Sequence, residues 1–248
     1  MIPVTVHGAE GRMGRLVTEL IDTADDCELV ALITEPGREI PAGELHPRLP
    51  VVGQDRLAGV HRSGGVIVDF SLAGALDGLL EGAASTSAPI VSGVTGHSED
   101  HLDALRRHAG TRPVVHAANF SVGIPALQMV LRLLGRTLPA GFDAEQVETH
   151  HRQKRDRPSG TAGWLARAWT TERGGDPPQT HSQRLGGVIG EHRWTLSDAE
   201  ETLELTHRAH SRRAFLRGVL PAVRFAATAA PGIYGLTDVL EDLAGSGR

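Results

Sequence analysis

The sequence predicts an α/β protein with two domains, and three observations lead to this prediction. Strand-like and helix-like runs alternate through the first half of the 248-residue chain, which is typical of a parallel sheet covered by helices. A glycine-rich turn joins the first strand to the first helix. In the second half, strand-like runs alternate polar and apolar residues, as in a sheet with one exposed face.

The first 35 residues have the order strand, turn, helix, strand and acid. A β-rich run over 2–7 leads into the glycine-rich turn, and apolar residues then recur at helical spacing from Met13 to Ile21. A second strand is expected over 28–34, and Glu35 follows it. This is the first βαβ unit of a Rossmann-like dinucleotide-binding domain.

The rest of the first domain continues the alternation. Short continuous apolar runs predict buried parallel strands, and the segment 36–56, rich in Pro and Gly, predicts a loop. The expected strands cover 66–70, 89–93 and 114–117, and the expected helices cover 72–85 and 98–108, the latter with Ser98 as N-cap.

The second half predicts an α+β domain with a mixed or antiparallel sheet. Its expected helices cover 123–138 and 161–171, with a closing helix over 215–228; its expected strands cover 145–149, 193–196 and 202–207, and 172–181 is expected to be a polar loop. We therefore assign 1–120 and 216–248 to a dinucleotide-binding domain and 121–215 to a second domain.

Composition excludes several classes of protein. The net charge of −5 is mild and gives no reason to propose nucleic acid or membrane as a partner. Cys27 is the only cysteine, so an intramolecular disulfide and a thiolate metal cluster are excluded. The histidines form no His-Glu-x-x-His pair, and we predict no metal site. No segment has the roughly 20 apolar residues that span a bilayer, and we expect a cytoplasmic protein.

The glycine-rich turn is the candidate cofactor site. Gly8, Gly11 and Gly14 allow a tight turn, close approach of a pyrophosphate and close helix packing, although their spacing departs from Gly-x-Gly-x-x-Gly. Glu35 can accept hydrogen bonds from a ribose diol, and a carboxylate there favours NADH over NADPH. Arg12 and Arg38 are possible partners of a phosphate. The alternative is a glycine-rich turn that binds nothing.

The segment 148–162 is the candidate catalytic site. His150 and Lys154 can each supply a proton, and the helix start at 159–161 offers hydroxyls and free N–H groups to an anion. Reduction of a polarised double bond needs a hydride on one atom and a proton on its neighbour, so these groups suit a nicotinamide-dependent reductase acting on a small anion. The alternative is a basic surface loop with a well-capped helix.

The same segment resembles a known family signature. The signature of the 4-hydroxy-tetrahydrodipicolinate reductases of lysine and diaminopimelate biosynthesis is similar to Glu148-x-His150-His151-x-x-Lys154-x-Asp156-x-Pro158-Ser159-Gly160-Thr161-Ala162. Further motifs agree in order along the chain: Gly8 to Gly14, Asp69-Phe70-Ser71, Ala117 to Gly123, Gly190-Glu191-His192, Glu204 to His207 and Ser211-Arg212.

The resemblance implies a role for each matching position. His150 would be the catalytic histidine and Lys154 the proton donor. The substrate would contact His151, Ser159, Gly160, Thr161 and Thr95. The cofactor, NADH or NADPH, would contact Gly8, Gly11, Arg12, Met13, Glu35, Gly93, Thr95, Ala117, Ala118, Asn119 and Phe120. The resemblance also implies a small dicarboxylate substrate and a homotetramer associating through the sheets of the second domain, which makes 121–215 a substrate-binding and oligomerisation domain.

Some positions depart from the family pattern. Val94 stands where the family usually has a threonine, His97 where it has an aromatic residue and His116 where many members have a hydrophobic one, and the loop 172–181 is short. These departures leave two alternatives open. One is a related reductase acting on a different cyclic imine in specialised metabolism, and the other is a cofactor-binding protein without turnover.

Overall fold

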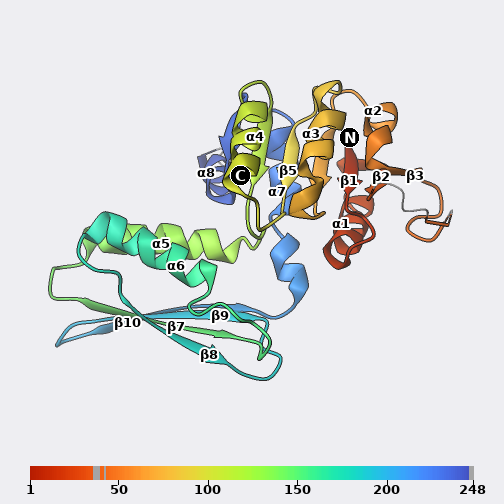
Figure 1. Ribbon diagram of the computed structural model, residues 1–248. Coiled ribbons are helices and arrows are strands. Elements are labelled where there is room, and N and C mark those ends of the chain that lie inside the picture. Colours follow the sequence, from red (N-terminus) through yellow and green to blue (C-terminus); the bar gives the residue numbers. More distant parts are fainter. Residues whose placement is uncertain (36–39, 42, 246–248) are drawn as a thin grey trace. The chain divides into compact units, whose positions relative to one another are not determined.

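The computed structural model describes residues 1–35, 40–41 and 43–245. The chain divides into two compact units. One unit comprises Met1–Phe120 with Leu216–Arg248, and the other comprises Ser121–Phe215. We call them unit 1 and unit 2 and describe each by itself (Figure 1).

Unit 1 is built on a parallel sheet. Among the described residues the strand order is β11-β6-β5-β4-β1-β2-β3, and every pairing is parallel. The strands are β1 (Ile2–His7), β2 (Cys27–Thr34), β3 (Val51–Gly53), β4 (Val66–Asp69), β5 (Ile90–Ser92), β6 (Pro113–His116) and β11 (Gly232–Tyr234). The central strands are almost wholly buried, because helices cover both of their faces. This confirms the Rossmann-like α/β fold predicted for the chain.

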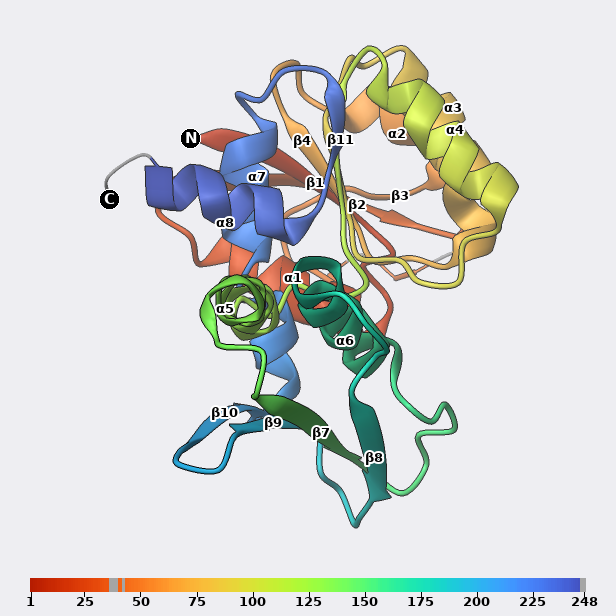
Figure 2. The same cartoon turned by 90° about the vertical axis from the view of Figure 1, so that its left-hand side faces the viewer.

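Two hydrophobic cores lie on the two faces of this sheet (Figure 2). On one face the strands pack against α1 (Arg12–Asp22), α7 (Val219–Ala226) and α8 (Leu236–Gly245). On the other they pack against α2 (Leu57–Val60), α3 (Leu76–Ala84) and α4 (Glu99–Ala109). Successive strand residues alternate between the cores, as the period of two of a β-strand requires.

Unit 2 places two helices on one face of a four-stranded sheet (Figure 1). Helices α5 (Gly123–Thr137) and α6 (Gly160–Arg173) share a core with that face, centred on Trp169 and Trp194. Among the described residues the order is β10-β9-β7-β8, formed by β7 (Asp143–His150), β8 (Gln179–Arg184), β9 (Gly190–Ser197) and β10 (Thr202–Ala209). The β7–β8 pair is parallel and the other pairs are antiparallel, so the sheet is mixed.

Three sequence-based expectations were wrong, and no element was predicted after residue 228. The loop predicted over 36–56 contains β3 and the 3-10 turn Gln54–Arg56, and the loop predicted over 172–181 runs into strand β8. The closing helix expected over 215–228 is broken into a 3-10 turn, Arg212–Leu216, and α7. The strand β11 and the helix α8 that follow were not predicted. Short or polar edge strands carry little hydrophobic periodicity, which explains why β3, β8 and β11 were missed.

Two helix starts were predicted correctly. Ser98 accepts a hydrogen bond from the His101 N–H at 3.2 Å, and Ser159 accepts one from the Ala162 N–H at 3.2 Å. Both serines therefore act as N-caps, which satisfy N–H groups that have no partner within the helix. No helix in the described part of the chain is long and apolar enough to cross a membrane.

Candidate active site

The turn between β1 and α1 can only be made with glycine. Gly8 has a φ of 76°, in the left-handed region, and a Cβ there would lie 2.6 Å from the backbone of Ser71. A Cβ at Gly14 would lie 2.0 Å from the carbonyl oxygen of Gly8. The glycines therefore bring the start of α1 close to the end of β1.

The start of α1 suits an anion. Its N-cap residue, Gly11, has no side chain to accept a hydrogen bond from the first turn, and that turn carries no acidic residue. The free N–H groups and the positive end of the helix dipole therefore remain available to a phosphate. Arg12 and Met13, two of the predicted cofactor residues, are the first residues of this helix.

The other predicted cofactor residues follow strands of the same sheet. Glu35 comes directly after β2, Gly93 and Thr95 come after β5, and the run 117–120 comes after β6. The carboxyl ends of parallel strands share one edge of a sheet, where ligands of such folds bind. Phe120 is fully buried and its ring lies 5.8 Å from that of Phe70. Arg38, a possible phosphate partner, lies outside the described residues.

A buried network fixes that edge of the sheet. His7 and Asp69 end neighbouring strands and are each 1% exposed, and His7 Nδ1 lies 2.9 Å from Asp69 Oδ1. Ser71 donates to the same oxygen from its hydroxyl at 2.6 Å, and Ser92 donates to Asp69 Oδ2 at 3.1 Å. Burial alone would raise the pKa of Asp69, but the bonds from His7 and Ser71 outweigh it and the pKa is lowered. The carboxylate therefore holds the ends of β1, β4 and β5 together.

Three residues that depart from the family pattern, Val94, His97 and His116, lie close together beyond the carboxyl end of β5. His116 Nε2 lies 3.0 Å from the Val94 carbonyl oxygen, and because a carbonyl only accepts, Nε2 carries the proton. The His97 ring lies 5.3 Å from that of His116 and 5.7 Å from that of His101. Burial, followed by the nearby charge of His116, lowers the pKa of His97. His116 thus anchors the backbone one residue before Thr95.

In unit 2, the end of β7 carries a buried acid and a histidine. Glu148 and His150 are two residues apart on the strand, so their side chains share a face, and His150 Nδ1 is hydrogen-bonded to Glu148 Oε2. Arg184, on neighbouring strand β8, donates to Glu148 Oε1 at 2.7 Å and to Glu148 Oε2 at 2.9 Å. The side chains of Glu148 and Arg184 are 0% and 2% exposed. Such a bidentate pair fixes the orientation of both side chains as well as pairing their charges.

The charges of this group determine which atoms hold protons. Burial would raise the pKa of Glu148, but hydrogen bonds from Arg184, Ser182 and His150 lower it, so the carboxylate is ionised and can only accept. Burial also lowers the pKa of His150, and the bond to Glu148 only partly offsets this. His150 is therefore neutral near pH 7, with its proton on Nδ1, and its Nε2 carries a lone pair.

Arg184 also holds the segment that follows β7. Its Nε donates to the Lys154 carbonyl oxygen at 3.2 Å, and a terminal nitrogen donates to the Asp156 carbonyl oxygen. The Lys154 N–H donates to the His151 carbonyl oxygen at 3.1 Å and closes the turn. One buried guanidinium thus fixes both Glu148 and the backbone that carries Lys154.

Asp156 connects the side chain of Lys154 to the start of α6. The Lys154 ammonium lies 2.9 Å from Asp156 Oδ1, and Asp156 Oδ2 accepts the Gly160 N–H at 3.4 Å. The hydrogen bond from Lys154 lowers the pKa of Asp156. The helix start that the sequence predicted as an anion site therefore already has one carboxylate at its edge.

Both halves of the chain match models of one protein family. Residues 2–120 match the N-terminal part of dihydrodipicolinate reductase, and residues 123–240 match its C-terminal part. The chain belongs to the dihydrodipicolinate reductase family. The resemblance read from the sequence motifs is therefore confirmed.

Relatives in this family match the chain almost end to end. The 4-hydroxy-tetrahydrodipicolinate reductase of Rubrobacter xylanophilus is 39% identical over 97% of this chain and 98% of its own. That of Thermomicrobium roseum is 38% identical over 97% of this chain and 100% of its own. Among solved structures, a dipicolinate-bound dihydrodipicolinate reductase from Paenisporosarcina sp. TG-14 has a TM-score of 0.81 at 22% identity, covering 96% of this chain and 99% of its own, and shares the fold.

Sequence analysis assigned no site role to two residues of unit 2 that contact or lie beside the Glu148–His150 pair. Arg184 lies at the end of β8, just beyond the predicted loop 172–181, and no motif marked it. His192 is buried on β9, its ring 5.4 Å from that of His150. Burial, followed by the electrostatic effect of the neighbouring His150 ring, lowers the pKa of His192 to about 3. The motif Gly190-Glu191-His192 marked the position of His192 but not its burial beside His150.

Proposed function

We propose that the protein catalyses the NAD(P)H-dependent reduction of 4-hydroxy-tetrahydrodipicolinate to tetrahydrodipicolinate in lysine and diaminopimelate biosynthesis. The observation that carries the proposal is the Arg184–Glu148–His150 arrangement with Lys154 beside it, in a chain whose relatives of this name match over nearly their whole length. For this role we expect the enzyme to act in the cytoplasm.

The backbone of unit 1 has a shape and free N–H groups that suit the binding of a dinucleotide. The close approach of Gly8 and Gly14 and the uncapped start of α1 form a cradle that a Cβ would fill. We assign the pyrophosphate to Gly8, Gly11, Arg12 and Met13, the adenosine ribose to Glu35, and the nicotinamide end to Gly93, Thr95 and 117–120. The nicotinamide supplies the hydride when it is bound.

Unit 2 fits the proton-transfer half of the reaction. Because His150 is neutral with its Nδ1 proton committed to Glu148, it has no acidic proton to give and can only accept at Nε2. Lys154 carries an ammonium on a segment fixed by Arg184. We therefore assign Lys154 as the proton donor and His150 as the group that orients the substrate or receives a hydrogen bond from it.

Substrate carboxylates would be held by His151, Ser159, Gly160 and Thr161, and the family resemblance also gives Thr95 a substrate contact. Dipicolinate bound to the Paenisporosarcina enzyme is a planar dicarboxylate of the expected class. Here Gly160 and Asp156 share a hydrogen bond at 3.4 Å, which is weak enough for a substrate carboxylate to replace.

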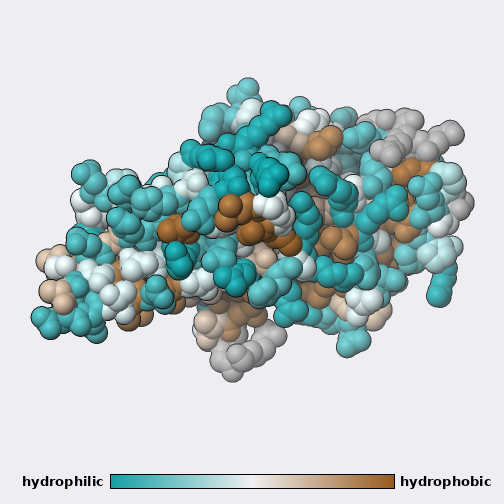
Figure 3. All heavy atoms as spheres, turned by 90° about the horizontal axis from the view of Figure 1, so that it is seen from below, coloured by the Kyte–Doolittle hydropathy of each residue, from teal (hydrophilic) through white to brown (hydrophobic). Residues whose placement is uncertain are grey.

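The outer face of the unit 2 sheet is our candidate for homotetramer assembly. Its exposed and half-exposed side chains alternate with the buried ones and include Glu145, Glu191, Arg193, Thr206 and Arg208. Figure 3 shows mainly hydrophilic and intermediate residues at its left, over the region of this sheet. Such a face would associate through polar contacts. Analytical ultracentrifugation measures the assembly: a species of about four chain masses supports the assignment, and a monomer refutes it.

The activity is tested with the purified protein, a coupled synthase that generates the substrate, and NADH or NADPH. We expect oxidation of the cofactor and competitive inhibition by pyridine-2,6-dicarboxylate. Binding of NADH without turnover of this substrate would refute the pathway assignment. It would favour the alternative, a reductase of another cyclic imine, which Val94 and the His97–His116 cluster make worth testing with a panel of cyclic imines.

A further inference from the structure

Glu10 lies in the glycine-rich turn and is fixed against the end of β2. The Glu35 N–H donates to Glu10 Oε1 at 3.1 Å. The N–H groups of Gly8 and Ala9 both donate to the Ile33 carbonyl oxygen, at 2.9 and 3.3 Å, so the turn runs alongside the last residues of that strand. Two acidic residues, Glu10 and Glu35, are therefore brought together although 25 positions separate them in sequence.

The second oxygen of Glu10 lacks a partner. Glu10 Oε2 is buried and accepts no hydrogen bond from the described residues. A buried carboxylate oxygen without a donor is unfavourable, so a hydroxyl group that a bound ligand brings to this atom would be stabilised there. A free ribose diol presents such donors, whereas a 2′-phosphate presents only acceptors and additional negative charge.

We propose that Glu10 is a specificity-determining residue which, together with Glu35, makes the cofactor site favour NADH over NADPH. The inference rests on the proposed function, since it assumes that a nicotinamide dinucleotide binds at this turn. The adenosine ribose of such cofactors binds near the acid that ends the second strand, and here that acid is Glu35. Glu10 adds a second carboxylate at the same place, so a 2′-phosphate meets two like charges.

The test measures binding rather than turnover. Isothermal titration calorimetry gives the Kd of NADH and of NADPH for the wild type and for Glu10→Gln, which keeps an oxygen acceptor for the Glu35 N–H but removes the charge. We expect the Kd for NADPH to fall about threefold to tenfold, as loss of one partly screened like charge predicts. We expect the Kd for NADH to stay within about twofold or to rise.

Two further variants separate charge from folding. Glu81→Gln removes the same charge from an exposed position of α3, and it should leave the ratio of the two Kd values unchanged. Glu10→Lys should lower the NADPH Kd further, and its gain should shrink at high salt. If Glu10→Gln changes both Kd values equally, or neither, the inference is overturned and Glu10 only anchors the turn.

These outcomes are distinct from failure of the proposed function. If the wild type binds NADH but reduces no lysine-pathway intermediate, the activity fails while the ratio of Kd values still decides the role of Glu10. If the wild type binds neither cofactor, both the activity and the inference are overturned.

Discussion

The guanidinium of Arg184 donates to both carboxylate oxygens of Glu148, at 2.7 and 2.9 Å, and both side chains are almost completely buried. A buried pair of this kind is costly to assemble, because two charges leave water, and costly to break, because one charge is then left alone. Here the pair touches His150 on one side and the carbonyl oxygens of Lys154 and Asp156 on the other. It therefore links strand β8 to His150, which we assign to orienting the substrate, and to the backbone of Lys154, which we assign as the proton donor.

Replacement of Arg184 should reduce turnover without affecting the cofactor. Arg184→Lys keeps a positive charge but cannot form the fork, so we expect kcat to fall at least about tenfold while the Kd for NADH, set by unit 1, stays unchanged. Arg184→Met leaves Glu148 buried and unpaired and should destabilise unit 2 by about 3–5 kcal/mol. Steady-state kinetics and urea unfolding measure the two effects.

The matched control is Arg132→Lys. Arg132 pairs with Glu172 between α5 and α6 but is 45% exposed, so its replacement should change stability by less than about 1 kcal/mol. Equal losses of activity in the two lysine variants would contradict a positioning role for Arg184.

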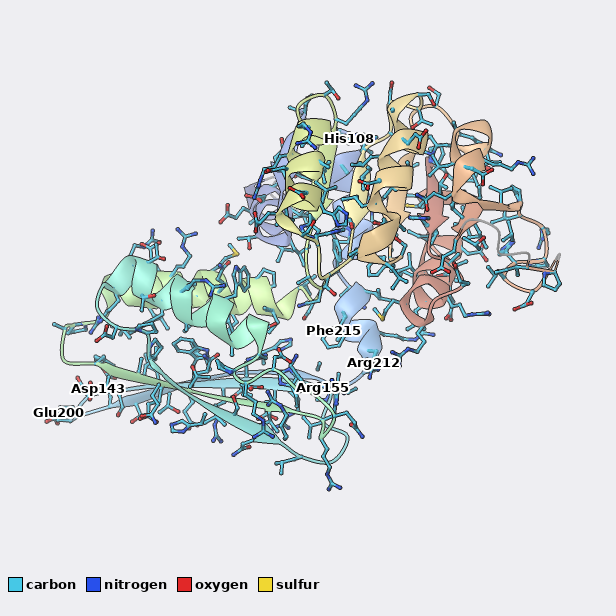
Figure 4. All side chains as sticks on the ribbon, viewed as in Figure 1. His108, Asp143, Arg155, Glu200, Arg212 and Phe215 are labelled. Atoms are coloured by element: carbon cyan, nitrogen blue, oxygen red, sulfur yellow. The ribbon has the colours of Figure 1, made fainter. Side chains whose placement is uncertain are left out.

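Removal of the Lys154 ammonium should abolish most turnover and spare cofactor binding. Lys154→Ala removes the group that we assign as proton donor, and loss of general-acid catalysis typically costs about 10²–10⁴-fold in rate. Arg155→Ala is the control, since Arg155 is an exposed cation in the same segment, at the end of the sheet opposite to Asp143 and Glu200 (Figure 4). A Lys154→Ala enzyme with an unchanged kcat would refute the assignment.

Acid should destabilise unit 2 through His192. The pKa of this buried ring is about 3, against 6.5 for an ordinary histidine. Below pH 6.5 His192 is therefore protonated in the unfolded chain but stays neutral in the native protein. The free energy of unfolding consequently decreases as the pH falls from about 6.5 to about 3, by up to ~1.4 kcal/mol per pH unit. His192→Leu should flatten this dependence.

The measurement is urea unfolding at pH 7, 6 and 5, followed by tryptophan fluorescence. All three tryptophans, Trp164, Trp169 and Trp194, belong to unit 2, so the signal reports on the correct part of the chain. His181→Gln, an exposed histidine on β8, should keep the wild-type slope. A His192→Leu variant with that same slope would show that other groups cause the acid sensitivity.

A methyl group at Gly14 should damage the cofactor site. The added Cβ would lie 2.0 Å from the Gly8 carbonyl oxygen and 2.9 Å from the Ala9 Cα, and neither backbone atom can move without opening the turn. We expect Gly14→Ala to weaken NADH binding at least about tenfold and to lower stability by about 1–3 kcal/mol, as overpacking does. Gly59→Ala, where a Cβ meets nothing within 4 Å, should bind NADH normally.

Much of the fold could be predicted because its signals are local. The buried strands of unit 1 are continuous apolar runs, and the serine caps of α4 and α6 precede their helices directly. Strand β8 escaped prediction because its sequence, Gln179 to Arg184, contains no apolar residue. It is a strand because the backbone of β7 supplies its hydrogen-bond partners, which a local pattern cannot reveal.

The residues of the candidate site were likewise predictable only where their signals are local. The glycines, Glu35, His150 and Lys154 lie within recognisable motifs, and the spacing of Glu148 and His150 on a strand predicts their shared face. The partners of those residues come from distant positions: Arg184 is 36 residues from Glu148, and Asp69 is 62 residues from His7. Buried polar pairs depend on how strands are ordered in the sheet, and the linear pattern contains no information about that order.

The division of unit 1 between the two ends of the chain has a consequence for biosynthesis. While the chain is being made, residues 1–120 emerge first, but α7, α8 and β11 complete their sheet and one of its two cores only after unit 2 has been translated. Unit 2 is continuous and can close its own core as soon as it leaves the ribosome. The nascent N-terminal segment therefore exposes apolar surface around Val6, Val68 and Val115 for the time taken to add about 100 residues. During that interval the exposed apolar surface makes the chain more prone to aggregation than it is once both ends of unit 1 have come together.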